Sequence, residues 1–179
     1  MASRSGVSVG AVDVYDAVVD VVEWADIRHV VQIAGGSGAL LAAILRRVPE
    51  ATGVLVDRPE VVAEAGPTLY AAGVTDRVDC MPGHLPNDVP PGGDLYVIAR
   101  AMTGWTDEHA LRLFRSCHEV MARSARFVLA EPSTPPARPC SQWFDLLKTA
   151  GFTPMGVRST EHAWVVIEAT PEERVPAPV

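Results

Sequence analysis

Residues 30–38 read Val-Val-Gln-Ile-Ala-Gly-Gly-Ser-Gly. The apolar run 29–33 predicts a short buried strand, and the segment 39–47 beyond the loop carries aliphatic residues at helical spacing. Between them lie three glycines, which are Gly35, Gly36 and Gly38. Glycine permits a tight turn and close approach of a ligand to the backbone, and the N-terminus of a helix presents free N–H groups. The stretch therefore predicts a strand–loop–helix unit with a ligand-binding loop.

The rest of the chain repeats this alternation of short apolar runs and helical segments. Further strands are predicted at 53–57, 77–81, 94–98 and 126–130. Helices are predicted at 11–26, at 59–73 with a kink or restart at Gly66-Pro67, at 108–123 and at 141–150. Strands separated by helices predict an α/β fold, in which a mostly parallel sheet is covered by helices on both faces. Residues 152–158 and 162–168 break the pattern and predict an antiparallel hairpin at the sheet edge.

Length, charge and cysteine content limit the class of protein. A chain of 179 residues predicts one domain, which we place at residues 1–170, followed by a loose proline-rich tail at 171–179. A net charge of -7 argues against nucleic acid or an anionic membrane as a partner. No apolar run is long enough for a membrane span, and the N-terminus lacks the apolar block of a signal peptide. Three separated cysteines without a CxxC pair predict a reducing, cytoplasmic location and no metal site.

Asp57 is a second candidate ligand-binding residue, because it follows the second predicted strand. In open parallel sheets, ligands bind at the carboxyl ends of the strands. A carboxylate at this place can accept hydrogen bonds from both hydroxyls of a ribose. The alternative is structural: the glycines only turn the chain, and Asp57 with Arg58 caps the next helix.

Six segments together resemble the small-molecule O-methyltransferase family, which methylates plant phenolics and bacterial aromatic polyketides with S-adenosylmethionine. The segments are residues 30–38, 53–62, 73–78, 82–85, 102–107 and 150–152. The resemblance covers residues 12–169. It implies the class I methyltransferase (Rossmann-like) fold, a mostly parallel seven-stranded sheet with an antiparallel last strand. It also implies a cofactor site for S-adenosylmethionine at Gly35, Gly36, Gly38 and Asp57.

Several cofactor positions depart from the family pattern. Gln32 stands where the family has an acidic residue that orders the loop near the methionine ammonium group, and Ala34 stands where it has a glycine. His84 corresponds to an adenine-contacting aspartate, and Ala99 to a cofactor-contacting lysine. These substitutions argue against retention of S-adenosylmethionine, although Asp57 and the glycine loop are kept.

The catalytic motif has changed as well. The catalytic histidine of the family's Leu-His-Asp-Trp motif corresponds to Thr103, and Gly104 replaces the aspartate. A threonine hydroxyl does not titrate near neutral pH, so Thr103 cannot replace histidine as the base that deprotonates a phenol. Trp105 is kept, and Glu131 corresponds to the family's first supporting glutamate, whereas the second has no counterpart.

Two structural pieces of the family have no counterpart in this sequence. One is the N-terminal helical domain that dimerises and roofs the substrate pocket. The other is a helical insert after the fifth strand, which is reduced here to residues 131–139. We therefore expect an open crevice, and an uncovered apolar surface that would suit a homodimer or a complex with another chain.

Three functional hypotheses follow. The first is an S-adenosylmethionine-dependent O-methyltransferase. The second, which we favour, is a natural-product enzyme that no longer methylates and instead promotes cyclisation, a pericyclic step or a rearrangement of a small polyketide-type molecule. Such steps need shape and a few hydrogen bonds rather than a titrating base. Its candidate catalytic residues are Thr103, His84, Trp105 and Glu131. The third is a non-catalytic partner subunit of a full-length enzyme.

Overall fold

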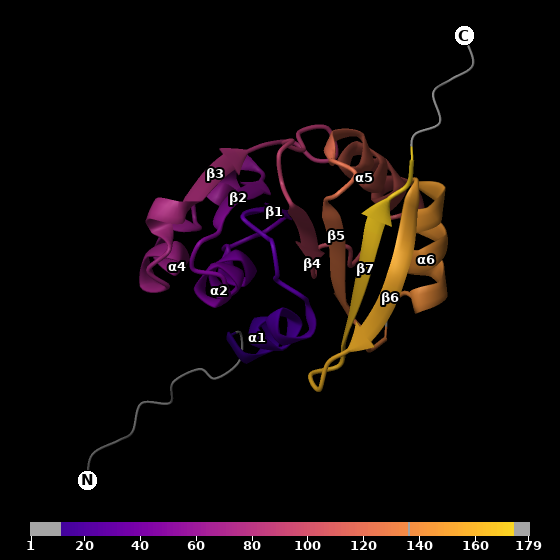
Figure 1. Ribbon diagram of the computed structural model, residues 1–179, viewed down its shortest axis with the longest axis horizontal. Coiled ribbons are helices and arrows are strands. Elements are labelled where there is room, and N and C mark those ends of the chain that lie inside the picture. The colour runs from indigo at the N-terminus through magenta and orange to yellow at the C-terminus, as the bar shows by residue number, and fades with distance from the viewer. Residues whose placement is uncertain (1–11, 136, 174–179) are drawn as a thin grey trace.

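The computed structural model describes residues 12–135 and 137–173, in which seven strands form a sheet with helices on both faces (Figure 1). The strands are β1 (His29–Ile33), β2 (Thr52–Asp57), β3 (Val78–Pro82), β4 (Leu95–Ala99), β5 (Arg126–Pro132), β6 (Phe152–Ser159) and β7 (Trp164–Pro171). Their spatial order is β3-β2-β1-β4-β5-β7-β6. The first five are mutually parallel, and β7 runs antiparallel to both β5 and β6. The predicted mostly parallel sheet with an antiparallel last strand is confirmed.

The helices divide between the two faces of this sheet. They are α1 (Val12–Val21), α2 (Ala39–Arg47), α3 (Pro59–Val62), α4 (Gly66–Ala71), the 3-10 turn η1 (Thr75–Arg77), α5 (Asp107–Val120) and α6 (Cys140–Thr149). Buried residues of α1, α2 and α4 belong to one hydrophobic layer, and those of α5 and α6 belong to the other. The fold is therefore doubly wound, as the alternation of strands and helices predicts.

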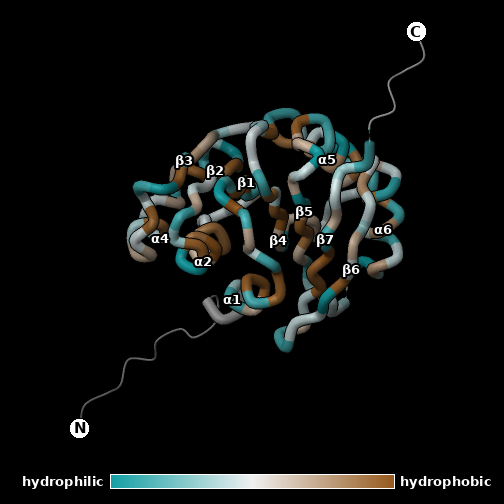
Figure 2. The backbone as a smooth tube through the Cα atoms, viewed as in Figure 1, coloured by the Kyte–Doolittle hydropathy of each residue, from teal (hydrophilic) through white to brown (hydrophobic). Residues whose placement is uncertain are grey.

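Strand β4 shows why most positions of the central strands are apolar. Leu95 and Val97 point into the layer below α1 and α2, whereas Tyr96 and Ile98 point into the layer below α5. Successive side chains on a strand point to opposite faces, so a strand covered on both faces favours apolar residues at successive positions. Figure 2 shows the same pattern, with hydrophobic residues gathered in α2 and the central strands.

Helix α2 lies close to the sheet because β2 offers no side chain at the contact. A Cβ atom at Gly53 would lie 2.6 Å from Cδ1 of the fully buried Leu41. The helix begins after Gly38, whose φ of 75° lies in the left-handed region that glycine adopts without strain. These contacts hold the glycine loop against the carboxyl ends of β1 and β2.

The first helix is shorter than predicted. The pattern at 11–26 predicts a helix of sixteen residues, but α1 ends at Val21. The chain then turns, and the buried indole of Trp24 donates a hydrogen bond from Nε1 to the Val19 carbonyl at 2.7 Å. This contact satisfies a carbonyl of the last helical turn, which otherwise lacks a partner.

The predicted antiparallel hairpin at the sheet edge is confirmed. Its second strand, β7, lies between β5 and β6, so that of the pair only β6 forms an edge of the sheet. Strand β7 continues to Pro171, the first residue of the predicted tail, and residues 174–179 lie outside the described part of the chain. No helix in the described part is long and apolar enough to cross a membrane.

Candidate functional site

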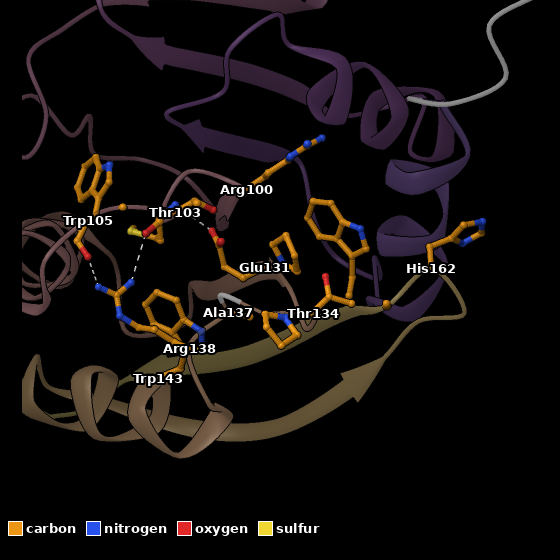
Figure 3. Close-up of a pocket in the computed structure, with 15 residues that line it drawn as sticks. Arg100, Thr103, Trp105, Glu131, Thr134, Ala137, Arg138, Trp143 and His162 are labelled. Carbon is orange, nitrogen blue, oxygen red and sulfur yellow. Dashed lines mark hydrogen bonds between the residues drawn. The ribbon is translucent and has the colours of Figure 1, made fainter.

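A cavity of about 720 Å³ opens at the carboxyl ends of β4 and β5. Its walls come from residues 100 and 102–105 after β4, residues 131–132, 134–135 and 137–138 around the end of β5, Trp143 of α6, and residues 162–164 at the start of β7. Parallel strands end at the same edge of a sheet, and an antiparallel neighbour begins there. The topology therefore brings three segments that are far apart in sequence to one place (Figure 3).

Three of the four candidate catalytic residues line this cavity. Thr103 and Trp105 lie in the loop after β4, and Glu131 is the next-to-last residue of β5. His84 does not line it: this side chain is exposed in the loop after β3, and its backbone N–H donates to Oδ2 of Asp88 at 2.7 Å. The structure thus brings together the residues that follow β4 and β5 and leaves His84 apart from them.

Glu131 is the acidic residue of the cavity. It is 5% exposed, and its Oε1 accepts hydrogen bonds from the backbone N–H groups of Ala101 and Met102, each at 3.1 Å. Burial raises the pKa of Glu131, while these two hydrogen bonds and the nearby positive charge of Arg138 oppose the shift. A carboxyl group with a raised pKa can both donate and accept a proton nearer to neutral pH than an exposed glutamate can.

The walls around Glu131 are aromatic. Trp105, Trp143 and Trp164 all line the cavity, and the last two are almost fully buried. Trp143 and Trp164 pack in the hydrophobic core, and each also presents a surface to the cavity. Indole rings offer large flat apolar surfaces, which suit a planar aromatic ligand.

The glycine loop and Asp57 form a separate unit at the ends of β1 and β2. Oδ2 of Asp57 accepts the N–H of Gly36 at 2.9 Å, and its Oδ1 accepts the N–H of Arg58 at 2.8 Å. A carboxylate has about four lone-pair sites, so two remain for other donors. The half-buried Asp57 thus organises the loop and can still accept two hydroxyl groups.

Gln32 is turned toward the protein rather than toward a ligand. Its side chain is 3% exposed; Oε1 accepts the N–H of Leu41 at 2.9 Å, and Nε2 donates to the Gly35 carbonyl at 3.4 Å. The amide links the glycine loop to α2 and carries no charge. Ala34 adopts a φ of 52°, a left-handed conformation that disfavours a residue with a Cβ atom.

Comparison with known proteins identifies the family of this chain. A family model described as the O-methyltransferase domain matches residues 11–149. The chain belongs to this family. Phenazine O-methyltransferase PhzM of Lysobacter antibioticus is 35% identical over 132 residues, covering 73% of this chain and 39% of that protein. The structure titled "Crystal Structure Analysis of LaPhzM" superimposes with a TM-score of 0.82 and 29% identity, covering 89% of this chain and 55% of that one.

Another relative has a different named activity. Aclacinomycin 10-hydroxylase RdmB of Streptomyces purpurascens is 31% identical over 117 residues, covering 65% of this chain and 31% of that protein. The chain thus spans well under half the length of these two relatives. It is a methyltransferase-fold protein whose relatives act in natural-product biosynthesis.

Sequence reasoning missed three basic residues of the cavity. Arg138 lies in the segment before α6, Arg100 follows β4, and His162 lies in the turn before β7. Figure 3 shows the imidazole of His162 at the rim, directed away from Thr103. Nothing in the local sequence pattern marks these residues, because their position depends on how the segments after β4, β5 and β6 meet. Across the described ranges, no cluster of three metal-ligating side chains is present.

Proposed function

We propose that this chain carries the catalytic domain of a natural-product enzyme that binds an aromatic small molecule in the cavity beside Glu131. The proposed step is a cyclisation, pericyclic reaction or rearrangement rather than O-methylation driven by a histidine. The observation that carries this proposal is that Thr103, whose hydroxyl cannot act as a base near neutral pH, lines one cavity with Glu131, a buried carboxyl group with a raised pKa. The relative named as a hydroxylase supports it, because it shows that the family includes a protein named for another reaction.

The roles of the cavity residues follow from their contacts. Trp105, Trp143 and Trp164 would hold the ring system of the ligand by stacking and apolar contact. Oε1 of Glu131 is fixed by two backbone N–H groups, so the other carboxyl oxygen is available to hydrogen-bond a hydroxyl or carbonyl group of the ligand. Thr103 would add a neutral hydroxyl as donor or acceptor. Orientation and a small number of hydrogen bonds would then favour one reaction path of a reactive intermediate.

S-adenosylmethionine-dependent O-methylation is the second candidate, and the nucleoside end of the cofactor site supports it. Asp57 can accept a ribose diol beside the glycine loop, in which Gly36 leaves open space where a Cβ atom would be. The methionine end fits less well, since the buried amide of Gln32 offers no negative charge to an ammonium group. When bound, the cofactor would supply an electrophilic methyl group, and Glu131 would have to hold the proton that a phenol releases.

One experiment separates the two candidates. The gene is deleted in its producing organism and complemented with the wild type, with Glu131→Gln or with Arg123→Met, an exposed residue outside the cavity lining, as a control. Under the first proposal, the deletion strain and the Glu131→Gln strain accumulate an isomer of the final product. Accumulation of a compound that lacks one methylene unit would instead establish methylation. Calorimetry of the purified chain with S-adenosylmethionine provides the matching binding test.

Association with a second chain remains a proposal of its own. Tyr70 and Met155 are large apolar residues that are 81% and 67% exposed, on α4 and β6 respectively. Exposed residues of this kind are often contact points between chains. Size-exclusion chromatography with light scattering tests whether the chain forms a homodimer.

A further inference from the structure

The loop that carries Thr103 is held from two sides. On one side, the N–H groups of Ala101 and Met102 donate to Glu131. On the other side, the guanidinium of Arg138 donates to two carbonyl groups of the same loop. Nη1 reaches the Met102 carbonyl at 3.3 Å, and Nη2 reaches the carbonyl of Trp105. Both backbone polar groups of Met102 therefore have hydrogen-bond partners. Thr103 and Gly104 are the two residues between the anchored positions Met102 and Trp105 (Figure 3).

Arg138 is itself firmly anchored. Its Nε donates to Oδ1 of Asp107 at 3.0 Å, and its guanidinium lies 4.7 Å from the centre of the Trp143 ring. Gln142 donates to the other oxygen of Asp107 at 2.8 Å, which orients that carboxylate. The Arg138 side chain is only 16% exposed. Planar guanidinium groups with several fixed partners lose less freedom per hydrogen bond than lysine side chains do.

We propose that Arg138 is a positioning residue that locks the 101–105 loop and the segment before α6 into one wall of the cavity, so that two loop N–H groups stay on the Glu131 carboxylate. This inference rests on the proposed function, in which Glu131 is the group that touches the ligand. Arg138 acts through the loop and does not itself react. The role requires arginine, because one guanidinium group contacts two carbonyl groups, a carboxylate and an indole ring at the same time.

The charges around Glu131 make the role of Arg138 measurable. Arg138 comes from the segment before α6, Arg100 from the loop after β4, and His162 from the turn before β7, and all three line the cavity with Glu131. Asp107 of α5 is the acidic neighbour that pairs with Arg138. Burial raises the pKa of Glu131, and the positive charge of Arg138 lowers it. Removing that charge and the fixed N–H groups must raise the pKa of Glu131 further.

The test uses the ligand-free chain, so its result does not depend on whether an aromatic molecule binds. The Glu131 carboxyl carbon is labelled and titrated by NMR, with Glu131→Gln for assignment, and amide hydrogen exchange is followed at Ala101 and Met102. In Arg138→Met we expect a higher pKa of Glu131 and at least about tenfold faster exchange of both amides. Arg138→Lys keeps the positive charge but loses the several N–H donors of the guanidinium. The pKa of Glu131 in this variant should therefore lie close to that of the wild type, whereas exchange of the two amides should stay fast, as in Arg138→Met.

Two comparisons make the result decisive. Arg123→Met removes an exposed ion pair with Glu173 and should change neither readout. If Arg138→Met does not fold, Asp107→Ala replaces it, because this change removes the carboxylate that anchors the guanidinium and should still accelerate exchange at Met102. Unchanged exchange and an unchanged Glu131 titration in Arg138→Met, or full restoration of slow exchange by lysine, would overturn the proposal.

Discussion

Replacing Arg77 by methionine should weaken the attachment of α2 to the sheet. The guanidinium of Arg77 lies at the C-terminal end of α2, where the carbonyl groups have no helical partners. It donates to four carbonyls, those of Leu45 at 3.0 Å, Val48 at 3.4 Å, Pro49 at 2.9 Å and Ala51 at 3.0 Å. Methionine keeps the apolar stem but removes every donor. Because α2 begins at the glycine loop, this contact also supports the candidate nucleoside site.

The size of the effect follows from these contacts. Three of the four hydrogen bonds are short, and each contributes about 0.5–1 kcal/mol at a partly solvated site. The positive charge near the helix C-terminus adds about 0.3–1 kcal/mol. The expected loss in the free energy of unfolding is therefore about 2–4 kcal/mol. For a chain of this length, that loss corresponds to a decrease in Tm of about 5–10 °C.

Urea denaturation followed by circular dichroism measures this loss. The matched control is Arg47→Met, because Arg47 is an exposed cation in the last turn of the same helix, with no hydrogen bond or ion pair to the described residues. The control removes a charge near the helix end but no carbonyl contacts. Arg77→Lys should lose part of the stability, since an ammonium cannot reach all the carbonyls. A difference below about 0.5 kcal/mol between Arg77→Met and Arg47→Met would refute the reasoning.

Three further predictions concern the loop and the cavity. Gly53→Ala should destabilise the chain by about 1–3 kcal/mol in the same denaturation assay, because the new methyl group overlaps the buried Leu41. The control Gly66→Ala should have no such cost, because a Cβ atom there meets open space. Ala34→Gly should stabilise the chain by up to about 1 kcal/mol, since relief of the left-handed φ outweighs the added freedom of the unfolded chain; a lower Tm would contradict this. Burial raises the pKa of Glu131 from 4.5, so the stability of the wild type relative to Glu131→Gln should be greatest below pH 4.5 and should fall as pH rises through the raised pKa. Parallel urea titrations of both proteins across this range would show a constant difference if the carboxyl group were not buried.

Much of the site could be predicted from the sequence, because residues that follow the ends of parallel strands lie at the same edge of the sheet. Thr103 and Glu131 follow the ends of predicted strands, and parallel strands place their carboxyl ends together. The same rule brought His84 into the prediction, but β3 lies at the far edge of the sheet, three strands away from β4. Sequence order does not give the spatial order of strands, so it could not separate His84 from the other residues.

The roles of Gln32 and Arg138 show a second limit. The sequence marks Gln32 as an uncharged replacement in the glycine loop, but not that its amide bonds to Leu41 and Gly35. Arg138 lies in a proline-rich segment without any periodic pattern. Its partners, Met102 and Trp105, are more than thirty residues away. Such contacts depend on rotamers and loop packing, which a one-dimensional pattern does not encode.

The amino-acid sequence by itself determined the alternation of strands and helices, the glycine loop and the absence of a titrating side chain at position 103. These features depend on side-chain periodicity, backbone freedom and the chemistry of single residues, all of which are local. Only the tertiary structure placed β7 between β5 and β6 and built the cavity wall around Glu131. It did so because hydrogen bonds and burial between distant segments are satisfied only in the assembled sheet.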